Sequence, residues 1–544
     1  MKDADQYQRE LDVIDSVEGK SASTKFLAYA KISGPGWLQG AITLGGGSLA
    51  GALFLGVIAG YSLLWVQPVA MICGIIMLSA IAYVTLSTGE RPLRAINQHL
   101  HPLLGWSWLV ATVMANIVWV MPQFALGVGA IEENLFGAEF GKGATYLVIT
   151  LLFALGLFVN YLYESGGKSA KTFDLIIKIM VGIIVLCFFA VVVSLLMSGK
   201  LPLGQIFSGF LPNPMGLANL SPELEAEVAQ SSNPGWWKDQ LLGAQRDRAF
   251  TAFGTAVGIN MTFLLPYTLL KKKWGPRHRG LSITDLSIGL FVPFFLATTC
   301  VVIASAASFQ GNAEGLDMAK VLEKAALVPA AEGVTTEQLA TDVRLAPNLI
   351  SRNQSALATT LEPAVGSFVA QKIFGIGVIG MAVSTIIILM LINGLAFQEI
   401  LSDSRARDRA ASEAALSNKK NFFIGCLISG AAGFLFPLLW TGDSKAAFAV
   451  PTSVIGGSLI PIAYFTFFLL MNSKKVLGDK RPEGTARLIW NVLMGIATIT
   501  ATAGSVWATW PKKFGDIPAG KIGTAFLVVL FVVGTVSFLK KEKA

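Results

Sequence analysis

Long apolar runs are the feature of this sequence that most restricts its fold. About twelve blocks of roughly 20 mainly apolar residues follow one another, each long enough to cross a hydrocarbon core of roughly 30 Å as a helix. A bilayer admits only helices and closed barrels, and barrel strands would be about 10 residues of alternating polarity. The sequence therefore predicts an all-α polytopic membrane protein. The expected spans lie near residues 34–57, 62–87, 104–129, 145–163, 173–198, 249–270, 284–309, 365–397, 421–440, 448–472, 485–508 and 520–539.

Composition argues against the common soluble classes. Hydrophobic residues make up 53% of the chain and charged residues only 14%, whereas soluble domains have about 25% charged residues. The net charge is +8, but the basic side chains are scattered over short loops and form no continuous basic face. We therefore expect the lipid bilayer as the surroundings, no nucleic-acid partner and no obligatory protein partner.

The basic residues also indicate how the chain is oriented. They concentrate in the loops that follow even-numbered spans, whereas the short loops on the other side hold few of them. Because positively charged loops stay on the cytoplasmic side, we expect an integral protein of the plasma (inner) membrane with both termini in the cytoplasm. The basic residues of these loops are Arg91, Arg94, Lys168, Lys171, Lys271, Lys272, Lys273, Arg277, Arg279, Arg405, Arg407, Arg409, Lys419, Lys420, Lys474, Lys475, Lys480 and Arg481.

The order of spans and loops divides the chain into five parts. The two long outer loops mix Pro, Gly, Asn and acidic residues and are expected to form extracytoplasmic caps. The inner stretch 402–420 suits either a short interfacial helix or a solvated linker. The five parts are a cytoplasmic N-terminal tail (1–33), a first five-helix repeat (34–198), an extracytoplasmic loop (199–248), a second five-helix repeat (249–472, with the outer loop 310–364), and two additional helices with a short cytoplasmic tail (473–544).

A run of small residues interrupts the first span. Gly45, Gly46 and Gly47 are followed by Ser48, and each glycine destabilises a helix by about 1 kcal/mol relative to alanine. One interpretation is close packing of small residues against a neighbouring helix. The other is an unwound segment whose backbone lines a binding site.

The sixth span holds a counterpart, in which Gly258, Asn260 and Met261 precede Pro266. A kinked packing helix would also explain this pattern, and Met261 suits either packing or a soft ligand. Spans 1 and 6, however, each open a five-helix half, and interruptions at matching positions of two repeats point to a transporter's midplane site. Gln123 of the third span is a further polar group for such a site.

The spans lack the groups that an intramembrane enzyme or a proton relay would need. The histidines His99, His101 and His278 lie in loops, and no acidic residue stands near the middle of a span. The sequence shows no phosphate loop, zinc-protease motif or catalytic triad. We therefore expect no enzyme, no cofactor and no confident metal ligand, while a divalent cation or Na⁺ stays open as a transported or coupling ion.

Two segments resemble a known family. The segment GPGWLQGAITLGGGSLAGALFLGVIAGYSLLWV (34–66) is similar to the first helix and following turn of the Nramp (natural resistance-associated macrophage protein) metal-ion transporters. The segment TGERPLRAINQHLHPLLGW (88–106) resembles the family's loop between helices 2 and 3. The resemblance implies a LeuT-type fold: a five-plus-five inverted repeat, about 12 transmembrane helices, interrupted helices 1 and 6, and alternating access.

The family's working residues do not carry over. Its Asp-Pro-Gly-Asn motif on helix 1 aligns with residues 45–48, and its Met-Pro-His motif on helix 6 aligns with residues 258–260. The proton-carrying acids of its helix 3 align with Met121 and Phe124. Every difference removes a charge or a metal ligand, so the chain resembles a divergent Nramp-related transporter that lacks the family's metal-binding residues.

Two binding sites are expected. The residues expected to bind the substrate are Gly45, Gly46, Gly47, Ser48, Gly258, Asn260, Met261 and Gln123. Ser384 and Thr385 stand in an otherwise apolar stretch of span 8, where other LeuT-type transporters bind Na⁺ together with helix 1 carbonyls, here that of Leu44. The alternative is that both hydroxyls donate to carbonyls of their own helix.

Three functions fit these observations. The first is a secondary transporter of the Nramp-related class that moves a cation by alternating access, with Mg²⁺ or Mn²⁺ expected from the family. The second is the same fold moving a small organic solute, either coupled to Na⁺ or uncoupled. The third is a non-transporting membrane receptor. Because a dication is costly to dehydrate and no carboxylate compensates here, a partly hydrated ion is expected in the first case.

Overall fold

A computed structural model describes most of the chain. The described residues are 2–32, 35–165, a few between 182 and 199, 201–313, 315–329, 333–401, 418–442 and 444–543. The predicted fifth span (173–198) and the inner stretch 402–417 lie wholly or mostly outside them.

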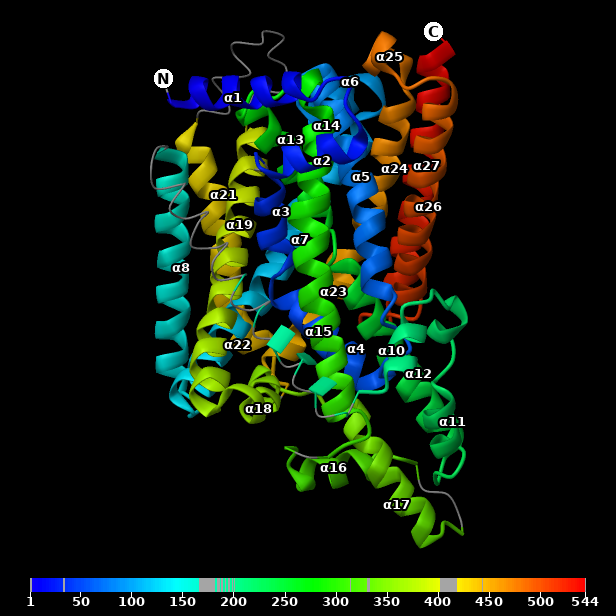
Figure 1. Ribbon diagram of the computed structural model, residues 1–544. Coiled ribbons are helices and arrows are strands. Elements are labelled where there is room, and N and C mark those ends of the chain that lie inside the picture. The colour runs from blue at the N-terminus through cyan, green and yellow to red at the C-terminus, as the bar shows by residue number, and fades with distance from the viewer. Residues whose placement is uncertain are drawn as a thin grey trace.

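The described residues form helices that run between two polar ends (Figure 1). The helices of the membrane region are α3 (Pro35–Thr43), α4 (Gly46–Ala59), α5 (Val66–Thr88), α7 (Pro102–Gly129) with η1 (Ala130–Phe136), α8 (Lys142–Ser165), α12 (Pro234–Gly254), α13 (Ile259–Lys271), α14 (Arg279–Leu286) with η4 (Ser287–Phe291) and α15 (Val292–Phe309), η6 (Val369–Ile373) with α19 (Phe374–Leu401), α21 (Lys419–Ala432) with η7 (Gly433–Leu435) and α22 (Phe436–Leu439), η8 (Ala446–Phe448) with α23 (Ala449–Gly457) and α24 (Ile460–Asn472), α26 (Gly484–Thr509) and α27 (Ala519–Lys543). The shorter helices of the two ends are α1 (Lys2–Ser16), α2 (Ala22–Ala30), α6 (Pro92–His99), α10 (Leu203–Gly209), η2 (Pro214–Leu217), α11 (Pro222–Val228), η3 (Pro276–His278), α16 (Met318–Ala325), α17 (Thr336–Leu345), η5 (Ala346–Leu349), α18 (Gln354–Val365), α25 (Lys474–Leu477) and η9 (Gly478–Lys480).

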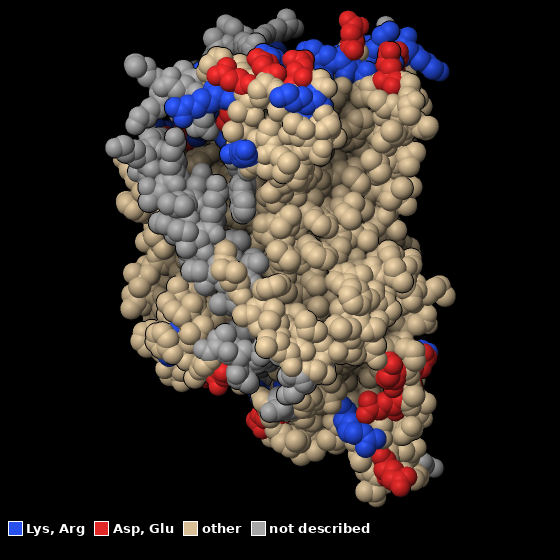
Figure 2. Space-filling model, viewed as in Figure 1, with Lys and Arg blue, Asp and Glu red and all other residues tan. Residues whose placement is uncertain are grey.

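The all-α polytopic architecture is confirmed. Among the described residues, ten helices are long and apolar enough to cross a bilayer, and α3 and α4 together supply the first span in two pieces. Charged side chains gather at the two ends of the molecule, and the broad band between them carries almost none in the view of Figure 2. Both chain termini lie at the same end, opposite the short helices α11, α16 and α17 (Figure 1).

The first membrane helix is broken as predicted. Helix α3 ends at Thr43, and α4 begins at Gly46 after Gly45 has adopted an extended backbone (φ −94°, ψ −176°). A Cβ atom on Gly45 would lie 2.5 Å from Thr385 Oγ1, and one on Gly47 would lie 2.9 Å from Thr255 Cγ2. The two interpretations of the glycine run therefore hold together: the chain unwinds here, and its neighbours also pack too closely for larger residues.

The sixth membrane helix is broken at the matching position. Helix α12 ends at Gly254, and α13 begins at Ile259 after the extended Gly258 (φ −79°, ψ 163°). Helix α12 begins at Pro234 rather than near residue 249, because its first turns leave the apolar region and enter the outer cap. Arg248, which is buried, donates to the carbonyl oxygen of Asn348 over 2.7 Å in that cap.

The two long outer loops fold together into one helical cap, which lies at the bottom of Figure 1. Asp342 of α17 accepts hydrogen bonds from the backbone N–H of Ser232 (3.1 Å) and from Trp237 Nε1 (2.7 Å). Arg344 pairs with Glu227 of α11 over 3.2 Å. These contacts join residues from both loops, and that the cap is extracytoplasmic stays a prediction.

Candidate functional site

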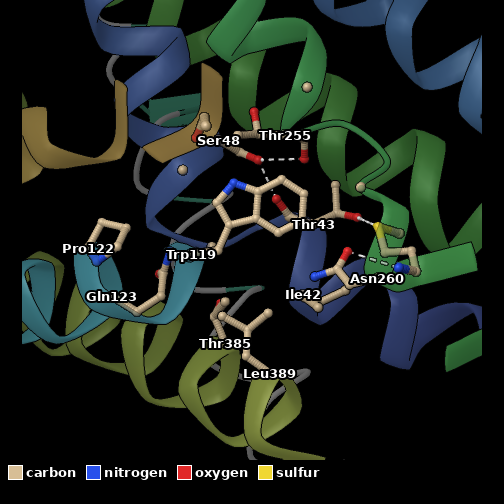
Figure 3. Close-up of a pocket in the computed structure, with 16 residues that line it drawn as sticks. Ile42, Thr43, Ser48, Trp119, Pro122, Gln123, Thr255, Asn260, Thr385 and Leu389 are labelled. Atoms are coloured by element: carbon tan, nitrogen blue, oxygen red, sulfur yellow. Dashed lines mark hydrogen bonds between the residues drawn. The ribbon is translucent and has the colours of Figure 1, made fainter. Parts of the chain in front are cut away.

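A buried cavity of about 50 Å³ lies between the breaks of the first and sixth helices (Figure 3). This volume holds roughly three to five water molecules. Its lining comes from five membrane helices and includes both breaks. The lining residues are Ile42, Thr43, Gly45, Gly47, Ser48, Trp119, Pro122, Gln123, Gly254, Thr255, Gly258, Asn260, Met261, Thr385, Leu389 and Ser453.

Hydroxyl groups connect the two breaks directly. Ser48 Oγ lies within hydrogen-bond distance of the carbonyl oxygens of Thr43 and Thr255, the latter at 3.3 Å. Thr43 Oγ1 lies 3.2 Å from the carbonyl oxygen of Ala256. Carbonyls at the end of a helix have no helical N–H partner, so these hydroxyls satisfy part of the unwound backbone and hold α3, α4 and α12 together.

One carboxamide side chain accepts a hydrogen bond at the start of the second half of each broken helix. Gln123 Oε1 accepts from the N–H of Gly46 over 3.0 Å, and Asn260 Oδ1 accepts from the N–H of Met261 over 2.8 Å. The amide oxygens thus cover the positive ends of the α4 and α13 dipoles. The carbonyl ends of α3 and α12 also lie beside the cavity. Their carbonyl oxygens at Thr43, Thr255 and Ala256 accept from the Ser48 and Thr43 hydroxyls, and each carbonyl oxygen has a second lone pair.

Met261 is placed at the cavity, but its sulfur already has a contact. Met261 is buried, and its Sδ lies 3.3 Å from Thr43 Oγ1. A thioether is only a weak acceptor, and the same hydroxyl also lies 3.2 Å from the Ala256 carbonyl oxygen.

The two hydroxyls of the predicted Na⁺ site have the same hydrogen-bond acceptor but differ in whether they reach the cavity. Ser384 Oγ and Thr385 Oγ1 both donate to the carbonyl oxygen of Met381, over 3.0 and 2.8 Å. Only Thr385 lines the cavity, where its hydroxyl lies against Gly45. Three predicted site residues are sequence neighbours of lining residues but do not line the cavity themselves: Leu44, Gly46 and Ser384.

Sequence reasoning missed Trp119, Thr255 and Ser453 as lining residues. Trp119 precedes Gln123 by four residues, which places both side chains on one face of a helix, and this spacing was the available signal. Ser453 has no comparable signal, since the packing of α23 against α12, α7 and α4 brings it to the cavity.

No charged side chain lines the cavity in the described part of the chain. The buried acidic groups of the membrane helices lie near helix ends and have partners. Glu132 pairs with Lys445 over 2.6 Å, and Glu399 accepts from Arg91 over 2.9 Å and from Tyr267 over 2.7 Å. Nor do the described residues contain a cluster of three or more His, Cys, Asp or Glu residues suited to a metal ion. The cavity is therefore a neutral site built from backbone and side-chain dipoles.

Comparison with known proteins identifies the family. The model of the family described as natural resistance-associated macrophage protein-like (Nramp) matches residues 36–510, which is most of the chain. The chain belongs to the Nramp-like family. No curated protein sequence matches this Nramp-like chain significantly.

Solved structures show the same fold for this Nramp-like protein. A variant of the manganese transporter of Eremococcus coleocola superposes with a TM-score of 0.64 at 14% identity, covering 96% of this chain and 97% of that one. The same transporter in complex with an aromatic bis-isothiourea substituted compound gives 0.64 at 12% identity, with the same coverage. At this level of identity the likeness establishes the fold.

The sequence resemblance to the Nramp family aligns Gly45 and Ser48 with the outer positions of its Asp-Pro-Gly-Asn motif, and Gly45 has no side chain. The described lining of the cavity between the two breaks of this Nramp-like protein contains no carboxylate.

Proposed function

We propose that this protein is a secondary transporter that carries a divalent cation across the plasma (inner) membrane by alternating access, with both termini in the cytoplasm. The observation that carries the proposal is the pair of broken helices that meet at a buried cavity. Interrupted helices at matching positions of two repeats are the arrangement that LeuT-type transporters use for a site at the middle of the bilayer. The family points to Mg²⁺ or Mn²⁺ as cargo and away from an enzymatic role.

The dipoles around the cavity favour a cation. The carbonyl ends of α3 and α12 carry partial negative charge. Their carbonyl oxygens accept from the Ser48 and Thr43 hydroxyls and have a second lone pair for a cation, whereas the N–H groups of Gly46 and Met261 donate to Gln123 and Asn260. Neutral oxygens bind a dication more weakly than carboxylates do and strip off fewer of its waters. The cargo therefore crosses as a partly hydrated ion, with less preference for transition metals than a site built from carboxylate, Met and His ligands.

A small organic solute, coupled to Na⁺ or uncoupled, is the second candidate. Gln123 and Asn260 use their amide oxygens on backbone N–H groups, so each presents its NH₂ group as a donor. Such donors suit the oxygen atoms of a solute better than they suit a metal ion. Thr385 beside Gly45 keeps Na⁺ open as a coupling ion in either case.

Uptake by the purified protein in proteoliposomes tests the cation proposal. Mn²⁺ and Mg²⁺ are presented separately, with a metal-responsive dye inside the vesicles and empty liposomes as the blank. We expect saturable flux of at least one ion and its loss in Asn260→Ala. Asn219→Ala, the same substitution at an exposed site in the cap, is the matched control. Absence of flux for both ions would overturn the proposal and direct the search to organic solutes, with and without Na⁺.

A further inference from the structure

The indole of Trp119 is the largest side chain at the cavity. It stands in the middle of Figure 3, with Thr43 and Asn260 on one side and Pro122 and Gln123 on the other. The side chain is only 8% exposed, so nearly all of its surface contacts protein or faces the cavity. Whatever binds between the two breaks therefore has to fit beside this ring.

Two glycines from different helices make room for the ring. A Cβ atom on Gly258, at the sixth-helix break, would lie 2.7 Å from Trp119 Cη2. A Cβ atom on Gly456 of α23 would lie 2.6 Å from Cζ2 and 2.7 Å from Nε1 of the same ring. Contacts under 3.0 Å are not tolerated by real Cβ atoms, so the indole occupies space that exists only because both positions lack a side chain.

Two polar groups at this place need a partner that the protein does not supply. Trp119 Nε1 and Ser453 Oγ are buried, and neither has a hydrogen-bond partner in the described part of the chain. A buried donor without a partner is unfavourable. Both residues line the cavity, so water or cargo there would supply the missing partners.

We propose that Trp119 is the specificity-determining residue of the cavity. Its indole fills the gap between Gly258 and Gly456 and so limits the cargo to a small, partly hydrated ion. The identity of the cargo as a cation rests on the proposed function. The size limit does not, because the ring would restrict any molecule that reaches Ser453.

Cysteine labelling at Ser453 measures this limit without any transported ion. Ser453→Cys is treated in the full-length protein with two methanethiosulfonate reagents that differ in bulk, one bearing an ethylammonium group and the other an ethyltrimethylammonium group. Labelling of protein that keeps Ser453 is subtracted, to account for the native cysteines. The ratio of the two labelling rates is then compared with that in Ser453→Cys/Trp119→Ala.

We expect the bulky reagent to react at least about tenfold faster relative to the small one once Trp119 is removed. Gly456→Ala should act in the opposite direction and slow both reagents, because its Cβ pushes the ring into the cavity. Trp510→Ala, an exposed tryptophan at the end of α26, is the matched control and should leave the ratio unchanged.

An unchanged ratio in folded Trp119→Ala protein, judged by a single symmetric peak in size-exclusion chromatography, would overturn the proposal. If Trp119→Ala does not fold, the ratio of the two labelling rates is measured in Trp119→Phe and in Gly456→Ala. The two variants shift this ratio in opposite directions only if the indole limits the size of what reaches Ser453. Failure of cation flux in the unmodified protein would remove the proposed function and leave this labelling result unaffected.

Discussion

Gln123 Oε1 accepts a hydrogen bond from the N–H of Gly46 over 3.0 Å and so joins α7 to the second half of the broken first helix. This bond crosses between an unbroken helix and one half of a broken helix. It fixes the orientation of α4 and satisfies a donor that the break leaves without a helical partner.

Removing that cap should weaken both folding and transport. We expect Gln123→Leu, which keeps the volume but leaves the Gly46 N–H unpaired, to lower the free energy of unfolding by about 1–2 kcal/mol. Cation flux should fall at the same time, because α4 loses its anchor at the cavity. Thermal unfolding in detergent and proteoliposome uptake measure the two effects, and unaltered values for both would show that the bond has no role.

Restoring a carboxylate at the first break should increase affinity for Mn²⁺. Gly45→Asp alone should be poorly tolerated, because its Cβ would lie 2.5 Å from Thr385 Oγ1. In the double variant Gly45→Asp/Thr385→Ala the hydroxyl is gone, and we expect at least about tenfold tighter Mn²⁺ binding, or about 1.4 kcal/mol. Gly45→Asn/Thr385→Ala has the same shape without the charge and is the control for calorimetric titration. Equal affinity in the two double variants would contradict the prediction.

The hydroxyl pair of α19 allows a test of Na⁺ coupling. If Na⁺ drives transport, Ser384→Ala combined with Thr385→Ala should abolish the dependence of uptake on external Na⁺ while the protein stays folded. Both hydroxyls donate only to Met381 of their own helix, so their removal should cost little stability. Uptake that keeps its Na⁺ dependence in the double variant would eliminate this site.

The outer cap should be separable from transport. Asp342 accepts hydrogen bonds from Ser232 and Trp237 and joins the two outer loops. We expect Asp342→Ala to destabilise the cap locally by about 1–3 kcal/mol, because buried donors lose their acceptor, and to leave cation flux unchanged. Limited proteolysis of the 199–248 and 310–364 segments reports the first effect. A parallel loss of flux would show instead that the cap helps to form the site.

The interrupted helices could be predicted because glycine destabilises a helix relative to alanine. Gly45–Gly47 and Gly258 stand where a membrane helix otherwise has apolar side chains, and the breaks occur there. The basic loops predict the orientation of the spans, since positive charge is costly to move across a bilayer, and that orientation stays a prediction. These are local properties, each readable from a few consecutive residues.

The cap helices and part of the cavity could not be predicted because they depend on distant contacts. Helix α12 extends outward to Pro234 through charged turns that become stable only when residues such as Arg248 are buried against the second loop. Ser453 becomes a lining residue through the packing of α23 on α12, α7 and α4, which are distant in the sequence. Sequence reasoning did not single out Trp119, although its four-residue spacing from Gln123 places both on one helix face.

The neutral cavity has a consequence for the energy source of the proposed transport. A carrier without fixed charge at its site returns empty as a neutral unit, whereas the loaded form carries the whole charge of its dication through the membrane field. An inside-negative potential of 100 mV contributes about 2.3 kcal/mol per elementary charge, or about 4.6 kcal/mol for a divalent ion. This is sufficient for roughly 2,000-fold accumulation, so the resting voltage of the cell alone would drive uptake without a proton or a second ion.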